Sequence, residues 1–99
     1  MRKLPTRITI AGQEITVKAV PDLYERESCY GDWCARTNTI RVQQPSNDHP
    51  KDTIFATYMH EVFHAVLDLS GHTSWSREED FVERIGQLLY QSEKTRRYD

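Results

Sequence analysis

The sequence predicts a single α+β domain, in which a small antiparallel β-sheet of about three strands is followed by two packed helices. Short segments that alternate polar and β-branched residues are confined to residues 6–43. Apolar residues then recur at helical spacing over residues 50–70 and again over residues 77–92. A chain of 99 residues leaves room for one domain only.

The predicted strands begin with a β-hairpin. Residues 7–10 and 14–17 alternate in the manner of half-buried strands, and residues 11–13 between them include a glycine suited to a turn. Pro21 ends this pair, because proline lacks the amide that a sheet ladder requires. A third strand is expected over about residues 33–43.

The longer helix is predicted over about residues 50–70. Pro50 suits its first turn, and Gly71 lies where a glycine commonly ends a helix. The apolar positions repeat every three or four residues, so we expect them to form the stripe that faces the core. This stripe comprises Phe55, Met59, Val62, Val66 and Leu69, with Tyr58 beside it.

The last helix is predicted over about residues 77–92. Ser76 and Glu79 have the spacing of a capping box at its beginning. Gly86 lies in its middle, where glycine costs about 1 kcal/mol relative to alanine. We therefore expect Gly86 to allow a close approach between the two helices.

Composition restricts the partners and the location of the chain. The net charge is −2, and no block of Lys or Arg is long enough to neutralise a run of phosphates, which argues against nucleic acid as a partner. No apolar run has the length of a signal peptide or a membrane span, so we expect a cytoplasmic protein without a membrane partner. Cys29 and Cys34 are expected to stay reduced.

The longer helix contains His60-Glu61-Val62-Phe63-His64, a His-Glu-x-x-His motif. Side chains four residues apart lie on one helix face, so both imidazoles can reach one Zn²⁺. By helical periodicity, His60 and His64 lie away from the predicted core stripe and face a cleft or solvent. Glu61 leans off the ligand face, where it can act as a general base without binding the metal.

Two histidines hold zinc weakly, so a third ligand is needed. Glu79 is the preferred candidate because it shares a helix stripe with Gly86, which brings it towards the histidines. Glu83, one turn further on, is expected to accept a hydrogen bond from a ligand imidazole. The alternatives for the third ligand are Glu78, Glu83 and His72.

Residues 57–65 and 79–85 resemble the small phage and bacterial gluzincin-like metallopeptidases, which are related to the ImmA/IrrE family. Residues 30–32 and 39–42 are also similar to the strand that precedes the metal helix in that group. The resemblance spans about residues 30–90 and implies a minimal zincin-like fold with zinc-dependent peptidase activity. It also implies a glutamate pattern on the second helix, which falls here at Glu79 and Glu83.

In such an enzyme, Glu61 would take a proton from the water that attacks the scissile carbonyl and pass it to the leaving amine. The resemblance implies an edge strand that holds a protein or peptide substrate, and residues 38–42 are the candidate. A partner chain is a further candidate for completing the substrate site. Candidates for a second oxyanion donor are Tyr58, Tyr90 and His72.

Two other functions are compatible with the same residues. A zinc-stabilised binding or regulatory module would use the metal for folding and would not turn over substrate. A two-helix interaction protein would hold no metal. Zinc content distinguishes the last hypothesis from the other two, and peptide cleavage distinguishes the first two from each other.

Overall fold

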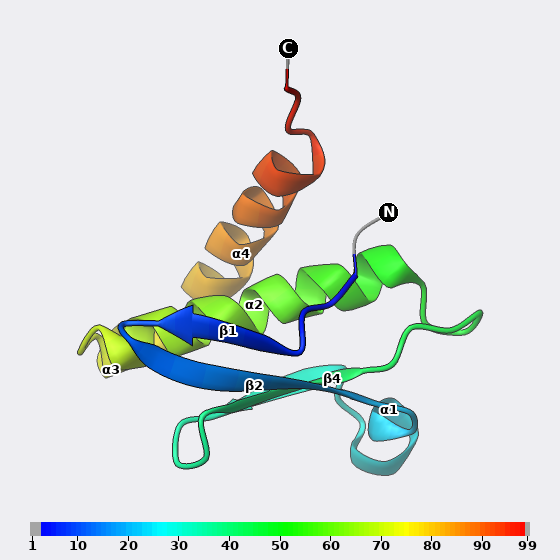
Figure 1. The fold of residues 1–99 in the computed structure, drawn as a ribbon, viewed down its shortest axis with the longest axis horizontal. Coiled ribbons are helices and arrows are strands. Elements are labelled where there is room, and N and C mark those ends of the chain that lie inside the picture. Colours follow the sequence, from blue (N-terminus) through cyan, green and yellow to red (C-terminus); the bar gives the residue numbers. More distant parts are fainter. Residues whose placement is uncertain (1–2, 99) are drawn as a thin grey trace.

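The computed structural model describes residues 3–98, and it confirms the α+β class (Figure 1). The strands in this range are β1 (Arg7–Ile10), β2 (Gln13–Val20), β3 (Gly31–Cys34) and β4 (Thr39–Gln43). The helices in this range are α1 (Leu23–Glu27), α2 (Lys51–Leu69), α3 (Thr73–Ser76) and α4 (Glu79–Lys94). None of these helices has the length and apolar character that crossing a bilayer requires.

The strands of the described chain form one mixed sheet in the order β1-β2-β4-β3. The predicted hairpin is confirmed, since β1 and β2 pair antiparallel, with Ile10 opposite Gln13. The expectation of an all-antiparallel sheet is wrong, because β2 and β4 pair parallel. The chain between them forms α1 and β3, so β4 returns beside β2 in the same direction.

The predicted third strand is two strands. Residues 35–38 turn the chain back between β3 and β4, and Asn38 closes the turn with φ 48°, a conformation that asparagine tolerates better than most residues. The outcome is an antiparallel pair in which Trp33 lies opposite Ile40. As a result β3 is an edge of the sheet, and β4 is internal.

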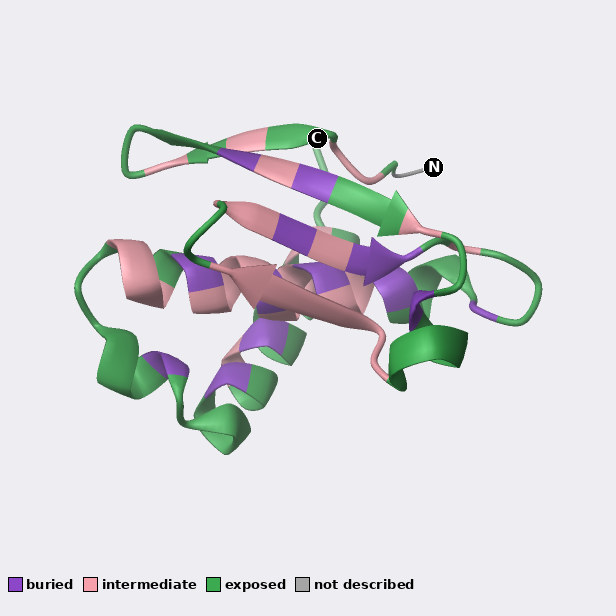
Figure 2. Cartoon of the chain, turned by 90° about the horizontal axis from the view of Figure 1, so that it is seen from below, coloured by how far each residue is buried: buried purple, intermediate pink, exposed green. Residues whose placement is uncertain are grey.

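Helix α2 lies along one face of the sheet. Helix α4 crosses α2 at a steep angle and projects away from the sheet (Figures 1 and 2). The core lies between the sheet and α2, where buried positions of β2 and β4 face the helix (Figure 2). Its buried members are Ile15, Val17, Ile40, Val42, Ile54, Tyr58 and Ala65.

The buried face of α2 differs from the predicted stripe. Ile54, Tyr58, Glu61 and Ala65 face the sheet, whereas Val66 is 37% exposed. The sequence periodicity is misleading because α2 is apolar on two adjacent sides, and the hydrophobic residues of the second side outnumber those facing the sheet. That second side, which includes Met59 and Val62, packs only partly against the core.

The helix boundaries follow the expectations within a few residues, with one local exception. Gly71 adopts φ 84°, and the amides of Gly71 and His72 donate to the carbonyls of Asp68 and Leu67, which closes α2 in a Schellman motif. The predicted capping box is not formed, because Glu78 is the N-cap of α4 and makes no side-chain cap. The residue expected to cap α4, Ser76, belongs instead to the short helix α3.

Candidate metal centre

The two histidines of the motif converge on one point. Their Nε2 atoms are 3.1 Å apart, and their ring centroids are 4.8 Å apart. The cause is local, since side chains at i and i+4 lie above one another on the same face of α2. Both side chains are largely covered, with 17% of His60 and 14% of His64 exposed. The pair therefore lies at the junction between α2 and α4 and is shielded from bulk solvent.

Glu79 completes a group of three possible ligands. Its Oε1 lies 2.7 Å from Nε2 of His64 and 3.7 Å from Nε2 of His60. Three ligands at tetrahedral angles around zinc stand about 3.3 Å from one another, given bond lengths of about 2.0–2.2 Å. The three observed separations bracket that value, so the His60, His64 and Glu79 side chains fit one face of a tetrahedral zinc site.

Gly86 explains how α4 comes this close. A Cβ atom at position 86 would lie 3.3 Å from Cα of His60, which is tighter than ordinary van der Waals contact. The predicted close approach at Gly86 is confirmed. This contact between the helix backbones sets Glu79, two turns earlier in α4, beside the histidines of α2.

The other ring nitrogens face different partners. Nδ1 of His64 lies 2.8 Å from the hydroxyl of Ser76, which is buried in α3. Nδ1 of His60 lies 2.9 Å from Oε2 of Glu83, an ion-pair contact that lacks the alignment of a hydrogen bond. Both contacts suit a proton on Nδ1, which would leave Nε2 of each ring available to a metal ion.

Glu61 is buried on the sheet-facing side of α2, where only 7% of it is exposed. Burial raises its pKa to about 8, and the charges of Asp32, Glu79 and Glu83 act in the same direction. A buried carboxyl group with a raised pKa, beside a group of potential metal ligands, is a candidate functional residue.

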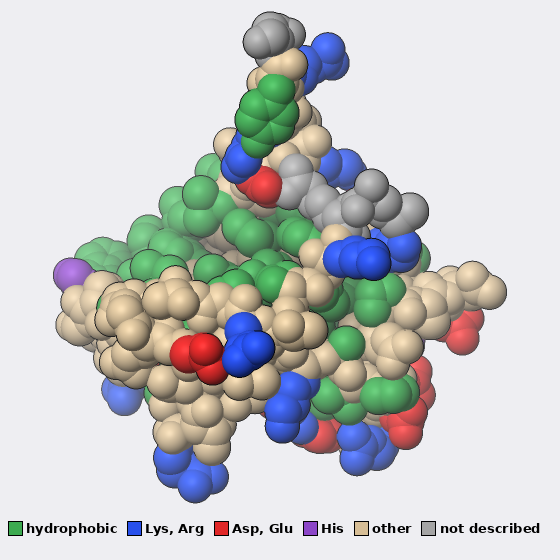
Figure 3. Space-filling view, in the orientation of Figure 1, with side chains coloured by type: hydrophobic (Ala, Val, Ile, Leu, Met, Phe, Trp, Pro, Cys, Tyr) green, Lys and Arg blue, Asp and Glu red, His purple; other side chains and the backbone are tan. Residues whose placement is uncertain are grey.

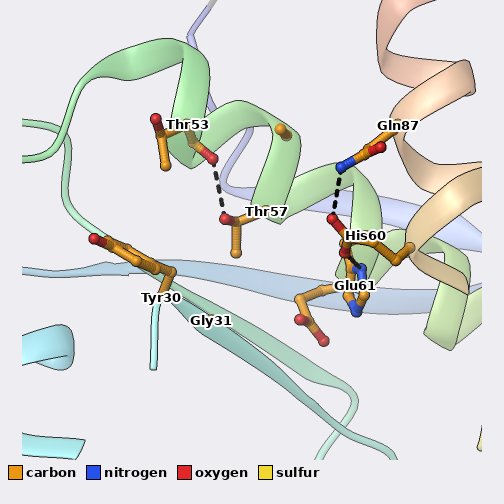
Figure 4. Close-up of a pocket in the computed structure, with 9 residues that line it drawn as sticks. Tyr30, Gly31, Thr53, Thr57, His60, Glu61 and Gln87 are labelled. Atoms are coloured by element: carbon orange, nitrogen blue, oxygen red, sulfur yellow. Dashed lines mark hydrogen bonds and ion pairs between the residues drawn. The ribbon is translucent and has the colours of Figure 1, made fainter. Parts of the chain in front are cut away.

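His60 and Glu61 open onto a cleft of about 450 Å³. Figure 4 shows Thr53, Thr57, His60 and Glu61 along α2, with Tyr30 and Gly31 opposite them at the start of β3. Both threonines line the same cleft as His60. Glu83 and Gln87 of α4 close the cleft, and the amide of Gln87 donates to Glu83 over 2.8 Å.

Several sequence candidates lie elsewhere. Nδ1 of His72 is 3.0 Å from the hydroxyl of Ser70, and neither His72 nor Glu78 belongs to the ligand group among the described residues. Of the candidate oxyanion donors, Tyr58 is buried in the core and the hydroxyl of Tyr90 donates to Asp52. None of these three candidate donors lines the cleft.

The candidate substrate strand also needs correction. Residues 38–42 fall mostly in β4, which is paired on both sides and offers no free edge. The edge beside the cleft is β3, which begins at the cleft-lining Gly31. The indole of Trp33 donates a hydrogen bond to Asp68 of α2 over 2.8 Å, which holds this edge strand against the helix.

Sequence reasoning missed Ser76, Tyr30 and Gln87 as residues around the site. Ser76 was assigned to a capping box, because the same Ser-x-x-Glu spacing suits both roles. Gln87 carries no motif, and Tyr30 entered the sequence analysis only as part of a strand. They reach the cleft through the position of β3 and the close approach of α4. A signal for Gln87 existed in the helical spacing, since it follows Glu83 by one turn.

A second group of possible ligands, Glu27, Cys29 and Asp32, is much less suited to a metal. The guanidinium of Arg41 already lies against both carboxylates, in a two-pronged contact with Glu27 and a second contact with Asp32. These contacts lower the pKa of Glu27 and offset part of the negative charge of the acidic pair. We interpret this group as an ion-pair network.

Comparisons with protein-family models, curated proteins and solved structures find no match to this chain.

Proposed function

We propose that this chain is a zinc-dependent metallopeptidase-like domain of the kind the His-Glu-x-x-His motif suggests. The observation that supports it most directly is the convergence of His60, His64 and Glu79 at separations suited to a tetrahedral metal. The ligands come from two helices, and the group lies at the end of an open cleft lined by Glu61. A purely structural ion pair would not require a buried carboxyl group at that position.

A zinc ion held by these residues would supply a Lewis acid and an acidified water to the reaction. Glu61 would take the proton of the attacking water and deliver it to the leaving amine. Without a cation, its pKa is raised to about 8, chiefly by burial. A divalent cation beside it would lower that pKa towards the range in which a carboxylate works as a base at neutral pH. Glu83 and Ser76 would orient the two imidazoles.

The substrate of this proposed enzyme is an extended segment of a protein or peptide. Strand β3 is an edge strand next to the cleft, and an extended peptide can pair with such an edge through main-chain hydrogen bonds. A Cβ at Gly31 would lie 2.8 Å from Cγ2 of Thr57 and 2.8 Å from the carbonyl of Arg41. The glycine therefore lets the start of this edge lie close against α2.

The decisive experiment compares the wild type with Glu61→Gln, after zinc loading, on a broad library of unstructured peptides. Glu61→Gln keeps the shape and removes the base, so we expect zinc stoichiometry to persist and cleavage to fall by about 100-fold or more. Glu14→Gln, an exposed substitution of the same kind on β2, should cleave like the wild type. Equal cleavage by Glu61→Gln and wild type would refute the assigned base.

One observation favours a second candidate function, that of a zinc-stabilised module without turnover. The ligands bridge α2 and α4, and α4 buries only Val82 and Gly86 in this structure. Metal bound there would add to a modest helix contact and stabilise the fold. If the chain is such a module, chelation should lower the melting temperature strongly, and the zinc-loaded wild type should cut no peptide of the library.

A further inference from the structure

An apolar face lies on the side of the α2–α4 junction that points away from the cleft. Figure 3 shows hydrophobic side chains gathered in the angle between the two helices. We define the apolar face by its six principal residues. They are Phe63, Val66, Trp75, Phe81, Leu88 and Leu89.

The apolar face is continuous across three helices. The ring of Phe81 in α4 lies 5.7 Å from that of Phe63 in α2 and 5.2 Å from that of Trp75 in α3. Along α4, Leu88 follows Phe81 by two turns and presents the same side. The exposed fractions reach 60% for Leu88 and 51% for Trp75, so residues 3–98 leave the face open.

The apolar face has an area comparable to that of a protein–protein contact surface. Contiguous apolar patches above a few hundred Å² are uncommon on monomeric proteins and mark contact surfaces. Five members of the face are each more than a third exposed, and three of the six are aromatic rings. Such a face is on the order of several hundred Å², which approaches the roughly 800 Å² that one partner contributes to a stable complex.

The distribution of charge along α4 suits a second copy of the same chain as the partner that covers the apolar face. Glu78 and Asp80, which lie outside the ligand group, stand at the beginning of the helix, and Arg97 follows its end. When two copies of such a helix pack antiparallel, the acidic beginning of each lies beside the basic end of the other. A two-fold axis produces this arrangement in both halves of the contact at once.

We propose that the chain forms a two-fold homodimer in which the apolar faces pack together and the two α4 helices run antiparallel. The axis passes near Leu88, which lies midway between Glu78 and Arg97 and is the most exposed leucine of the helix. Glu83 and Gln87, which line the cleft, lie on the opposite side of α4. Dimerisation therefore leaves the cleft open and is independent of the proposed peptidase activity.

Sedimentation equilibrium from 5 to 500 µM tests the association state, with the concentration range chosen to span about micromolar affinities. The wild type should be a dimer in the upper part of this range. Leu88→Glu should raise the dissociation constant at least tenfold, because it buries a charge at the axis. Gln44→Glu, on an exposed position just after β4, adds the same charge away from the face and should dimerise like the wild type.

A cysteine cross-link tests the antiparallel arrangement. In a Cys29→Ser, Cys34→Ser background, Leu88→Cys should form an intermolecular disulfide under mild oxidation, because only a residue near the axis meets its own copy. Glu78→Cys should not cross-link to itself. Circular dichroism confirms that each variant is folded. A wild type that stays monomeric to 500 µM, or a Leu88→Glu variant that dimerises unchanged, overturns the proposal.

Discussion

The carboxylate of Glu79 lies 2.7 Å from Nε2 of His64, across the junction of two helices that meet at a glycine. Glu79 is two-thirds exposed, whereas His64 is largely covered. The geometry thus combines a covered imidazole with a carboxylate on the solvent-exposed side of the pair. This combination suits a cation that binds after the protein has folded, since the exposed ligand can swing onto the metal last.

We expect Glu79→Gln to weaken zinc binding by more than about 100-fold. A carboxamide is a poor zinc ligand, and the loss should exceed the 10–100-fold that follows the removal of a residue supporting a ligand. Competition with a chromophoric chelator measures the affinity. Glu78→Gln is the matched control, because it removes the neighbouring carboxylate outside the ligand group. An equal loss in both variants would show that Glu79 acts only through the local charge.

Ser76→Ala should weaken zinc binding by about 10-fold while leaving the fold intact. The hydroxyl of Ser76 lies 2.8 Å from Nδ1 of His64, and its removal leaves that ring free to rotate or to change tautomer. The same competition assay measures the effect, and Ser74→Ala in the same short helix is the control. Thr at position 76 retains the hydroxyl and should restore much of the affinity. An unchanged affinity in Ser76→Ala would exclude this orienting role.

The geometry of the candidate ligand group was predictable from the sequence to the extent that it depends on one helix. The spacing of His60 and His64 determines that their side chains meet, whatever surrounds α2. The choice of Glu79 depended on Gly86, because a glycine inside a helix signals a close neighbour before that neighbour is known. Both inferences use local periodicity, which sequence patterns report well.

Features that depend on long-range pairing were not predictable in the same way. The parallel pairing of β2 with β4 follows from how α1 and β3 are inserted between them, and no short pattern encodes it. The assignment of residues 38–42 as the substrate edge failed for this reason. The predicted core stripe of α2 was wrong because the apolar side that flanks the core carries more hydrophobic residues than the side that faces the sheet. This second side continues into the apolar face.

Gly86→Ala should destabilise the protein by about 1–3 kcal/mol, although alanine is the better helix former by about 1 kcal/mol. The added Cβ would lie 3.3 Å from Cα of His60, and that atom belongs to the backbone of α2, which the core holds in place. The helices must therefore separate, which moves Glu79 away from the histidines. Urea unfolding and zinc titration should both show a loss.

The control for this substitution is Ser92→Ala, on an exposed position in the last turns of α4. It raises helix propensity without adding atoms at the junction, so its stability should equal or slightly exceed that of the wild type. A Gly86→Ala variant that is more stable than the wild type, with unchanged zinc affinity, would show that the helix junction has room for an added methyl group. The contact at Gly86 would then not position Glu79.

The stability of the metal-free protein should depend on pH through Asp52. The ammonium of Lys94 lies 2.8 Å from Asp52 Oδ2, and the hydroxyl of Tyr90 donates to Oδ1 over 2.6 Å, which joins the beginning of α2 to the end of α4. These contacts hold the pKa of Asp52 below its usual value, and the bond from Lys94 contributes most. Because the folded pKa is lower than the unfolded one, the stabilisation is complete above about pH 4 and is lost as the pH falls further.

Asp52→Asn should therefore reduce the free energy of unfolding at neutral pH. It should also make that free energy fall less steeply as the pH is lowered. Urea unfolding of chelator-treated protein from pH 6 down to about pH 3 measures both effects. Asp48→Asn removes an exposed carboxylate from the loop before α2 and should follow the wild-type profile. If Asp52→Asn and the wild type lose stability in parallel as the pH falls, the link between Asp52 and the end of α4 does not contribute to folding, and the orientation of α4 is set by the contact at Gly86 alone.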